Sequence, residues 1–196
     1  MSIIRFIMDV CKLKNVPRSG WIVYGVQPIQ TESVASHTFM TSFWTMIFAD
    51  MFKLEGLKVD VEKTIKMALL HDLAEVLTFD ISKHFLERIN EGKALKKKIM
   101  VKAQKSILHN LPVKELQSNY QQMFKEFEEE SIESKIVKAA DSFDVLIQII
   151  DYESKGYSKR NFEGLWQNIE KEINSLKIGF FFLRNLKIYE KEKYEY

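Results

Sequence analysis

The stretch Thr64-Ile-Lys-Met-Ala-Leu-Leu-His71-Asp72-Leu-Ala-Glu75-Val-Leu77 places three ionisable side chains, those of His71, Asp72 and Glu75, inside the apolar run that follows its lysine. Residues 59–79 contain no Pro or Gly and are rich in Ala, Leu, Met, Glu and Lys. This composition predicts a helix of about five turns, with Asp60 as its N-cap. The helix is apolar on nearly every side from position 67 to 77, which is typical of a buried helix.

In a regular helix, His71, Asp72 and Glu75 share one strip of the surface. Burying an ionised carboxylate without a partner costs several kcal/mol, so two carboxylates beside an imidazole indicate a positive charge among them. A divalent metal ion meets that need. The alternative is that His71 is an ordinary core histidine and its neighbour caps another segment. Three convergent ionisable groups favour a functional site.

Length and composition indicate one all-α domain over residues 1–196, with a core at about 10–155 and C-terminal helices at 159–190. The chain has only three Pro and seven Gly, and no linker rich in these residues divides it. The net charge of +2 is too small to indicate nucleic-acid binding. The basic helix 93–109, whose lysines run from Lys93 to Lys105, is balanced by the acidic stretch 126–130, so both are interpreted as solvated faces.

The single cysteine, Cys11, excludes an internal disulfide and is typical of a reducing compartment. The N-terminal segment lacks a cleavage pattern and is expected to be a first helix over residues 2–13. No apolar run is long enough for a membrane span. We therefore expect a cytoplasmic protein that does not associate with membranes.

Two further helices carry candidate ligands. Residues 33–54 show a 3.6-residue apolar stripe, and His37 lies in the first turn on the stripe side; a core or capping histidine is the alternative. Residues 131–154 have an apolar side, and Asp141 and Asp144 fall opposite it, which by periodicity alone indicates solvent. Periodicity therefore does not select Asp141 as a ligand.

The long connection 14–33 carries Arg18 and Trp21, groups suited to holding a phosphate and packing against a sugar or base. An ordinary surface loop pinned by a buried Trp is the alternative. After the His71-Asp72 helix the period breaks, and Asp80 lies just past the helix end. It is expected near the proposed metal, or as the N-cap of the next helix.

Four ordered motifs resemble the HD-domain metal-dependent phosphohydrolases, and within them the 5'-deoxynucleotidase branch. They lie within about residues 10–155 and read Pro17-Arg18-Ser-Gly-Trp21, Thr31-Glu-Ser-Val-Ala-Ser-His37, His71-Asp72-Leu-Ala-Glu75-Val-Leu-Thr-Phe-Asp80 and Val137-Lys-Ala-Ala-Asp141. Members often have Gly-Asp in the turn where this chain has Phe79-Asp80.

The resemblance implies an HD-domain helical bundle that hydrolyses deoxyribonucleoside 5'-monophosphates to deoxynucleoside and phosphate. It implies one divalent ion, a water served by Glu75 with help from Asp80, and phosphate and sugar contacts from Arg18 and Trp21. The implied metal ligands are His37, His71, Asp72 and Asp141.

Two imidazoles and two carboxylates suit Mn, Co, Fe or Mg better than a closed zinc site, and Zn or Ni is possible in purified protein. A homodimer is expected from the resemblance and from the aromatic segment Phe180-Phe-Phe182. The alternatives are another HD nucleotide hydrolase, acting on dNTP, (p)ppGpp or cyclic nucleotides, and a non-catalytic helical binding module.

Overall fold

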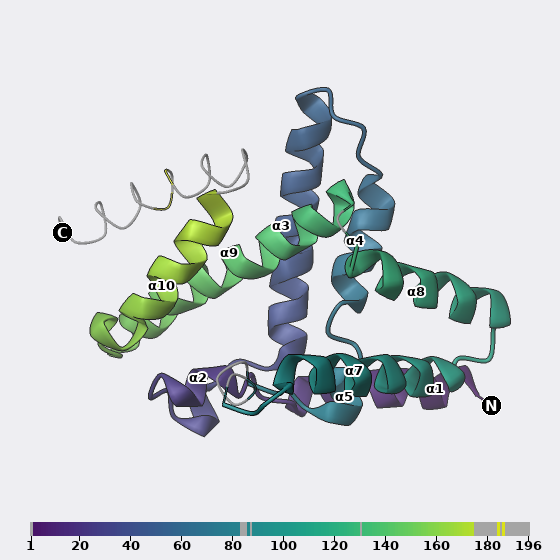
Figure 1. Cartoon of the computed structure of the whole chain (residues 1–196), viewed down its shortest axis with the longest axis horizontal. Coiled ribbons are helices and arrows are strands. Elements are labelled where there is room, and N and C mark those ends of the chain that lie inside the picture. Colours follow the sequence, from purple (N-terminus) through teal and green to yellow (C-terminus); the bar gives the residue numbers. More distant parts are fainter. Residues whose placement is uncertain are drawn as a thin grey trace.

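The computed structural model describes residues 2–82, 88–129 and 131–174, together with residues 86, 184 and 186. Every regular element in this part of the chain is a helix (Figure 1), which confirms the all-α prediction. None of the described helices is both long and apolar enough to cross a bilayer. The elements are α1 (Ile3–Cys11), η1 (Lys12–Asn15), α2 (Gly20–Val23), η2 (Pro28–Gln30), α3 (Val34–Leu54), α4 (Val61–Leu70), α5 (Glu75–Thr78), α7 (Gly92–His109), α8 (Lys114–Phe127), α9 (Ile132–Ser154) and α10 (Lys159–Asn174).

The helices α3, α4 and α9 begin at N-caps that the sequence makes available. The side chains of Ser33, Asp60 and Ser131 each accept a hydrogen bond from the backbone N–H three residues later, at 3.0 or 3.1 Å. Such a cap satisfies one of the N–H groups that a helix start leaves without an intrahelical partner. The predicted starts of these helices are therefore confirmed.

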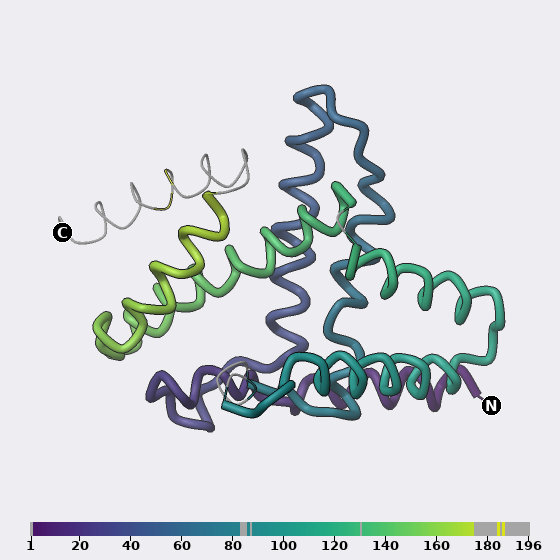
Figure 2. The backbone as a smooth tube through the Cα atoms, in the orientation of Figure 1, coloured from purple at the N-terminus to yellow at the C-terminus, as the bar shows by residue number. Residues whose placement is uncertain are grey.

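The long helices α3 and α4 run antiparallel, and α9 crosses them, as Figure 1 shows. α10 returns along α9, whereas α1, α5 and α7 gather at the end of the bundle where α3 begins (Figure 2). An isolated antiparallel bridge between Pro17 and Ser33 closes the loop that contains α2. The first turn of α3 thus lies among segments from distant parts of the sequence.

Two apolar clusters meet along α3. One surrounds α9 and α10 and includes Phe48, Tyr152 and Phe162, which are almost completely buried. The other includes Val34 and joins the start of α3 to α5, α7 and α8. Burying a side chain of this size contributes about 1.5–3 kcal/mol. His37 lies on α3 between these two attachments, so both clusters hold it in place.

The helix predicted for residues 59–79 is not continuous, and in this respect the prediction is wrong. α4 ends at Leu70, residues 71–74 form turns, and α5 starts at Glu75. The His71 ring explains the break, because its Nδ1 lies 2.6 Å from the carbonyl oxygen of Ala68. That oxygen would otherwise accept the backbone N–H of Asp72 in a continuing helix.

The most buried side of α3 differs from the aromatic stripe. Phe48 on the stripe is buried, but Phe43 on the same stripe is 42% exposed. The buried face instead carries His37 and a run of hydroxyl side chains, which are Thr38, Thr41, Ser42 and Thr45. Polar groups therefore fill the interior next to His37, where the sequence pattern indicated aromatic packing.

Some predictions fall on residues that the structure does not describe. The aromatic segment 180–182, on which the expected homodimer partly rests, lies outside the described residues. So does most of the predicted C-terminal helical region beyond α10. Residues 81 and 82, where a helix capped by Asp80 would begin, are described and are not helical, so Asp80 is not the N-cap of a helix that starts there.

Candidate metal centre

Three segments bring two histidines and two aspartates to one point. His37 Nε2, from the first turn of α3, lies 3.0 Å from Asp141 Oδ1 on α9 and 3.7 Å from Asp72 Oδ2. His71 Nε2 lies 3.2 Å from the same oxygen of Asp72. The structure thus brings together all four residues that the resemblance marks as metal ligands.

The contact that breaks the helix also orients the His71 ring. The Ala68 carbonyl can only accept, so Nδ1 of His71 carries the hydrogen and donates it. Nε2 then presents its lone pair to the cluster, and it has no hydrogen-bond partner among the described residues. A buried acceptor without a partner is costly, which favours a bound group at this position.

Asp144 orients the second ring, and the sequence analysis did not find this role. His37 is fully buried, and its Nδ1 lies 2.8 Å from Asp144 Oδ2. Trp44 Nε1 donates to the other carboxylate oxygen of Asp144 at 3.2 Å. A histidine that binds metal through one nitrogen commonly donates its other N–H to a carboxylate, which fixes the ring.

The expectation of solvent exposure is wrong for Asp144 and holds only in part for Asp141. α9 is buried on several sides, and Asp144 is only 3% exposed. The Asp141 side chain keeps 36% of its exposure while it reaches His37, so it lies at the edge between the buried cluster and a cavity. Two carboxylates three residues apart within the stretch 139–147, where most residues are apolar, were the signal available in the sequence.

Electrostatic interactions within the cluster are strong. Burial and the charge of Arg18 oppose protonation of His37, but hydrogen bonds with Asp141 and Asp144 outweigh them and raise its pKa to about 10. Burial also opposes the charge of Asp72, yet the neighbouring histidines and Arg18 hold the pKa of Asp72 well below its ordinary value. Asp72 and Asp141 therefore stay ionised beside these positive groups.

The donor set fits a divalent metal ion. Donor atoms of His37, His71 and Asp72 all lie within 4.8 Å of one another, and Asp141 adjoins them. Two imidazole nitrogens and two carboxylates are ligands of intermediate and hard character, and four such ligands leave positions open in an octahedron. A cation here would also satisfy His71 Nε2. The structure does not distinguish one metal from another.

Glu75 lies beside this cluster. It is 4% exposed, and its Oε2 has no hydrogen-bond partner among the described residues. Burial, followed by the charges of Asp72 and Asp80, raises the pKa of Glu75 to about 9. In the metal-free protein Glu75 therefore holds a proton at neutral pH, and a cation beside Asp72 would favour its ionised form, which can act as a base.

Asp80 follows α5 and contacts the loop that begins with Arg18. Its Oδ2 lies 3.4 Å from both Ser19 Oγ and Gly20 N, and its backbone oxygen accepts from Ser19 Oγ at 2.7 Å. The preceding residue, Phe79, has a φ of 57°, a region that glycine adopts far more readily than other residues. The turn therefore places Asp80 against the Arg18 loop even though Phe replaces the usual glycine.

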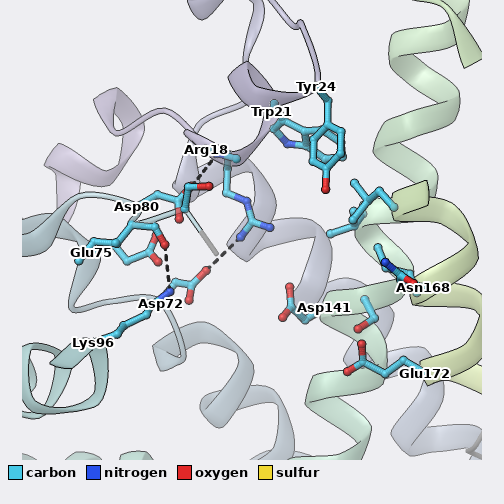
Figure 3. Close-up of a pocket in the computed structure, with 17 residues that line it drawn as sticks. Arg18, Trp21, Tyr24, Asp72, Glu75, Asp80, Lys96, Asp141, Asn168 and Glu172 are labelled. Atoms are coloured by element: carbon cyan, nitrogen blue, oxygen red, sulfur yellow. Dashed lines mark hydrogen bonds and ion pairs between the residues drawn. The ribbon is translucent and has the colours of Figure 1, made fainter. Parts of the chain in front are cut away.

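Arg18 reaches the cluster from this loop. Its Nη1 lies 3.3 Å from Asp72 Oδ2 (Figure 3). Its Nε lies 4.0 Å from Glu32 Oε1. The neighbouring carboxylates together keep the pKa of Arg18 above its ordinary value in spite of burial. Glu32 also accepts from Trp21 Nε1 at 2.9 Å, so one carboxylate links Arg18 and Trp21. The sequence analysis did not assign Glu32 a role.

Trp21 is a core residue with one edge at the site. It is 3% exposed and packs edge-on against Tyr152 and Phe162, with ring centroids 5.0 and 6.1 Å away. This agrees with the alternative of a loop pinned by a buried Trp. Trp21 also lines the cavity described below, and its predicted contact with the sugar stays a prediction.

A cavity of about 440 Å³ opens from the cluster towards α10. Figure 3 shows Asp72 and Asp141 at its centre, with Glu75 and Lys96 on one side and Asn168 and Glu172 on the other. Its apolar wall is on the α10 side, and it consists of Trp21, Tyr24, Val145, Leu165 and Ile169. A cavity of this size, with charged and apolar ends, suits a small phosphorylated ligand.

Comparison with known proteins finds one matching family and relatives that share one name. Residues 10–177 match the model of a family described as HD domain. The chain is 31% identical over 157 residues to the 5'-deoxynucleotidase hdd1 of Schizosaccharomyces pombe, which covers 79% of this chain and 74% of that protein. It is 27% identical over 174 residues to the human 5'-deoxynucleotidase HDDC2, covering 88% and 79% of the two chains.

Solved structures agree on the architecture. A crystal structure of a Pyrococcus horikoshii protein superposes with a TM-score of 0.77 at 31% identity, covering 94% of this chain and 96% of that one. An HD-domain phosphohydrolase from Listeria innocua superposes with a TM-score of 0.79 at 21% identity, covering 94% and 87%. The second similarity shows the fold alone.

Proposed function

This chain belongs to the HD domain family of metal-dependent phosphohydrolases, and from that premise we propose that it is a 5'-deoxynucleotidase. The reaction would convert a deoxyribonucleoside 5'-monophosphate and water to deoxynucleoside and inorganic phosphate. The relatives at about 30% identity are named 5'-deoxynucleotidases, which supports this choice of substrate.

The observation that carries the proposal is the convergence of His37, His71, Asp72 and Asp141, with Glu75 buried beside Asp72. The two histidines and two aspartates would hold one divalent cation. When bound, such a cation lowers the pKa of a coordinated water towards neutrality and offsets charge on the phosphoryl oxygens.

The protein's own residues would transfer the proton and position the substrate. Glu75 would accept the proton that the attacking water loses, because a cation beside Asp72 would favour the ionised form of this buried carboxylate. Arg18 lies 3.3 Å from Asp72 and can turn its guanidinium to a phosphoryl oxygen. Asp80 would assist at the leaving 5'-oxygen, and the edge of Trp21 would face the sugar.

The substrate would lie along the larger cavity. Its phosphoryl group would sit between Arg18 and the metal ligands, and its base would lie against the apolar wall that Tyr24, Leu165 and Ile169 form. We also propose that the protein acts on nucleotides as a homodimer. Size-exclusion chromatography with light scattering tests the oligomeric state directly.

Chromatographic analysis of the products tests the activity, because cyclic nucleotides, (p)ppGpp and deoxynucleoside triphosphates can be hydrolysed without release of inorganic phosphate. The chain is assayed with Mn²⁺ or Co²⁺ on deoxyribo- and ribonucleoside monophosphates, deoxynucleoside triphosphates, (p)ppGpp and cyclic nucleotides. We expect turnover to be highest with deoxyribonucleoside 5'-monophosphates. Preference for another class would identify a different HD hydrolase, and no turnover with any substrate would indicate a binding module.

The Glu75→Ala variant tests the assigned roles. We expect it to bind Mn²⁺ and to lose hydrolysis by about 10²–10⁴-fold, the usual contribution of a general base. Glu62→Ala is the matched control, because Glu62 lies on α4 with a side chain that is 77% exposed. An unchanged kcat in Glu75→Ala would remove Glu75 from the mechanism.

A further inference from the structure

A second cavity reaches the metal centre from the other side of Glu75. It has a volume of about 420 Å³, and its floor is formed by His71, Asp72 and Glu75. It shares Asp72, Glu75 and Lys96 with the larger cavity, so the two meet at these residues. Its wall is formed mainly by α7 and the end of α8, through Lys93, Lys96, Lys97, Met100, Val101, Gln104, Phe127 and Glu128.

Three lysines of α7 face this cavity together. Lys93, Lys96 and Lys97 are three and four residues apart, so they share one face of the helix. They lie in its first two turns, and no acidic residue occurs in the first turn. Because the N-terminus of a helix favours negative charge, helix stability does not account for lysines there. Their position is better explained by an anion that binds in the cavity.

Lys96 stands at the junction of the two cavities. Its side chain is partly buried, and its Nζ donates to the carbonyl oxygen of Ile81 at 3.3 Å. Figure 3 shows it on the same side of the site as Glu75, away from Arg18 and the apolar wall. The centre is therefore flanked by a guanidinium on one side and an ammonium on the other.

The cavity also contains carboxylates, and their positions matter. Asp72 and Glu75 are at the floor, where a bound divalent cation would offset their charge. Glu128 pairs with Lys97 at 3.3 Å, but both side chains are more than half exposed. Exposed pairs of this kind contribute little stability, so the pair can open for a dianion. Lys93 and Lys96 remain to face the centre.

We propose that this lysine-lined cavity binds inorganic phosphate, so that the two products leave on opposite sides. This rests on the proposed function, since phosphate is then a product. The neutral nucleoside leaves along the apolar wall of the larger cavity, and the phosphate dianion moves towards the lysines of α7. In such an arrangement the phosphate can leave the site without crossing the part of the cavity that the nucleoside occupies.

The test compares two double variants of α7 in Mn²⁺-loaded protein. Lys93→Met/Lys97→Met removes two lysines of the cavity. Lys98→Met/Lys102→Met removes the same charge from exposed positions on the opposite face of the helix. Titration calorimetry with inorganic phosphate should show a Kd that rises about tenfold in the first variant and stays at the wild-type value in the second. Circular dichroism establishes that both are folded.

Steady-state kinetics provide a second test of the proposal. With a deoxyribonucleoside monophosphate as substrate, the inhibition constant of added phosphate should rise more than KM in Lys93→Met/Lys97→Met. An equal rise in both would show that the lysines bind the substrate phosphoryl group, and an unchanged phosphate Kd would show no site; either overturns the proposal. Lysine-dependent phosphate binding without hydrolysis would refute the proposed function and leave the binding site standing.

Discussion

The raised pKa of Glu75 has a measurable effect on stability. The carboxyl is 4% exposed, and burial together with the charges of Asp72 and Asp80 raises its pKa to about 9. In the unfolded chain its ordinary value is near 4.5. Folding of the metal-free protein therefore takes up a proton between these two pH values. This contribution to stability is fully present below the lower value and is lost as pH rises towards the upper one.

The magnitude follows from proton linkage. One proton taken up on folding changes the free energy of unfolding by about 1.4 kcal/mol per pH unit. Between pH 6 and pH 8 the metal-free wild type should lose about 3 kcal/mol through Glu75. Glu75→Gln has the same shape and does not titrate, so it should escape this loss. At about 2–4 °C per kcal/mol for a chain of this size, its Tm advantage should grow by roughly 5 °C or more over that interval.

The assay is thermal unfolding in EDTA at several pH values, followed by circular dichroism. Glu62→Gln serves as the control, since Glu62 is largely exposed and pairs with Lys66 on the surface of α4. Saturating Mn²⁺ should reduce the pH dependence, because a cation at the centre favours ionised Glu75. A Tm difference between Glu75→Gln and wild type that is the same at pH 6 and pH 8 would refute the reasoning.

Three further changes have defined outcomes. Asp144→Asn leaves either His37 or Trp44 facing an amide N–H in place of an oxygen. It should therefore lower the free energy of unfolding, measured in urea, by about 1–3 kcal/mol. An unchanged free energy of unfolding would show that Asp144 holds neither group. Phe79→Gly relieves a backbone φ of 57° at a residue that is 63% exposed. The Tm of this variant should equal or exceed that of wild type. A clear fall in Tm would mean that the Phe side chain stabilises the turn. Gly92→Ala places a Cβ 2.1 Å from a backbone carbonyl oxygen, and should destabilise the start of α7 by about 1–3 kcal/mol, as seen in faster hydrogen exchange there; unchanged exchange would argue against this close approach.

The sequence predicts the long helices well because their signals are local. Ser33, Asp60 and Ser131 mark the predicted helix starts, and each acts as an N-cap, a role that the sequence analysis assigned to Asp60 alone. The break at His71 could not be predicted in this way, since every residue around it favours a helix. It depends on the histidine ring, which takes the carbonyl of Ala68 and so ends the regular pattern.

The candidate site was predictable only in part, for a related reason. Periodicity assigns polar residues to solvent, but the polar side chains of α3 and α9 meet inside the protein. Asp141 was marked by the resemblance alone, whereas Asp144 and Glu32 were missed, because a carboxylate that orients a histidine or an arginine has no spacing of its own. Their roles are visible only once α3, α9 and the Arg18 loop are placed together.

The bridge between Pro17 and Ser33 has a consequence for variation among proteins of this kind. Arg18 N donates to Glu32 O at 2.9 Å, and Val34 N donates to Val16 O at 2.8 Å, so both ends of the intervening loop are tied together. Lengthening a loop whose ends are already joined changes the chain entropy only slightly, by about 0.6 kcal/mol per doubling. The exposed tip around Ile29 can thus gain or lose residues while Arg18 and His37 keep their positions. Evolution, or an engineer, can therefore exchange this tip without rebuilding the reactive centre.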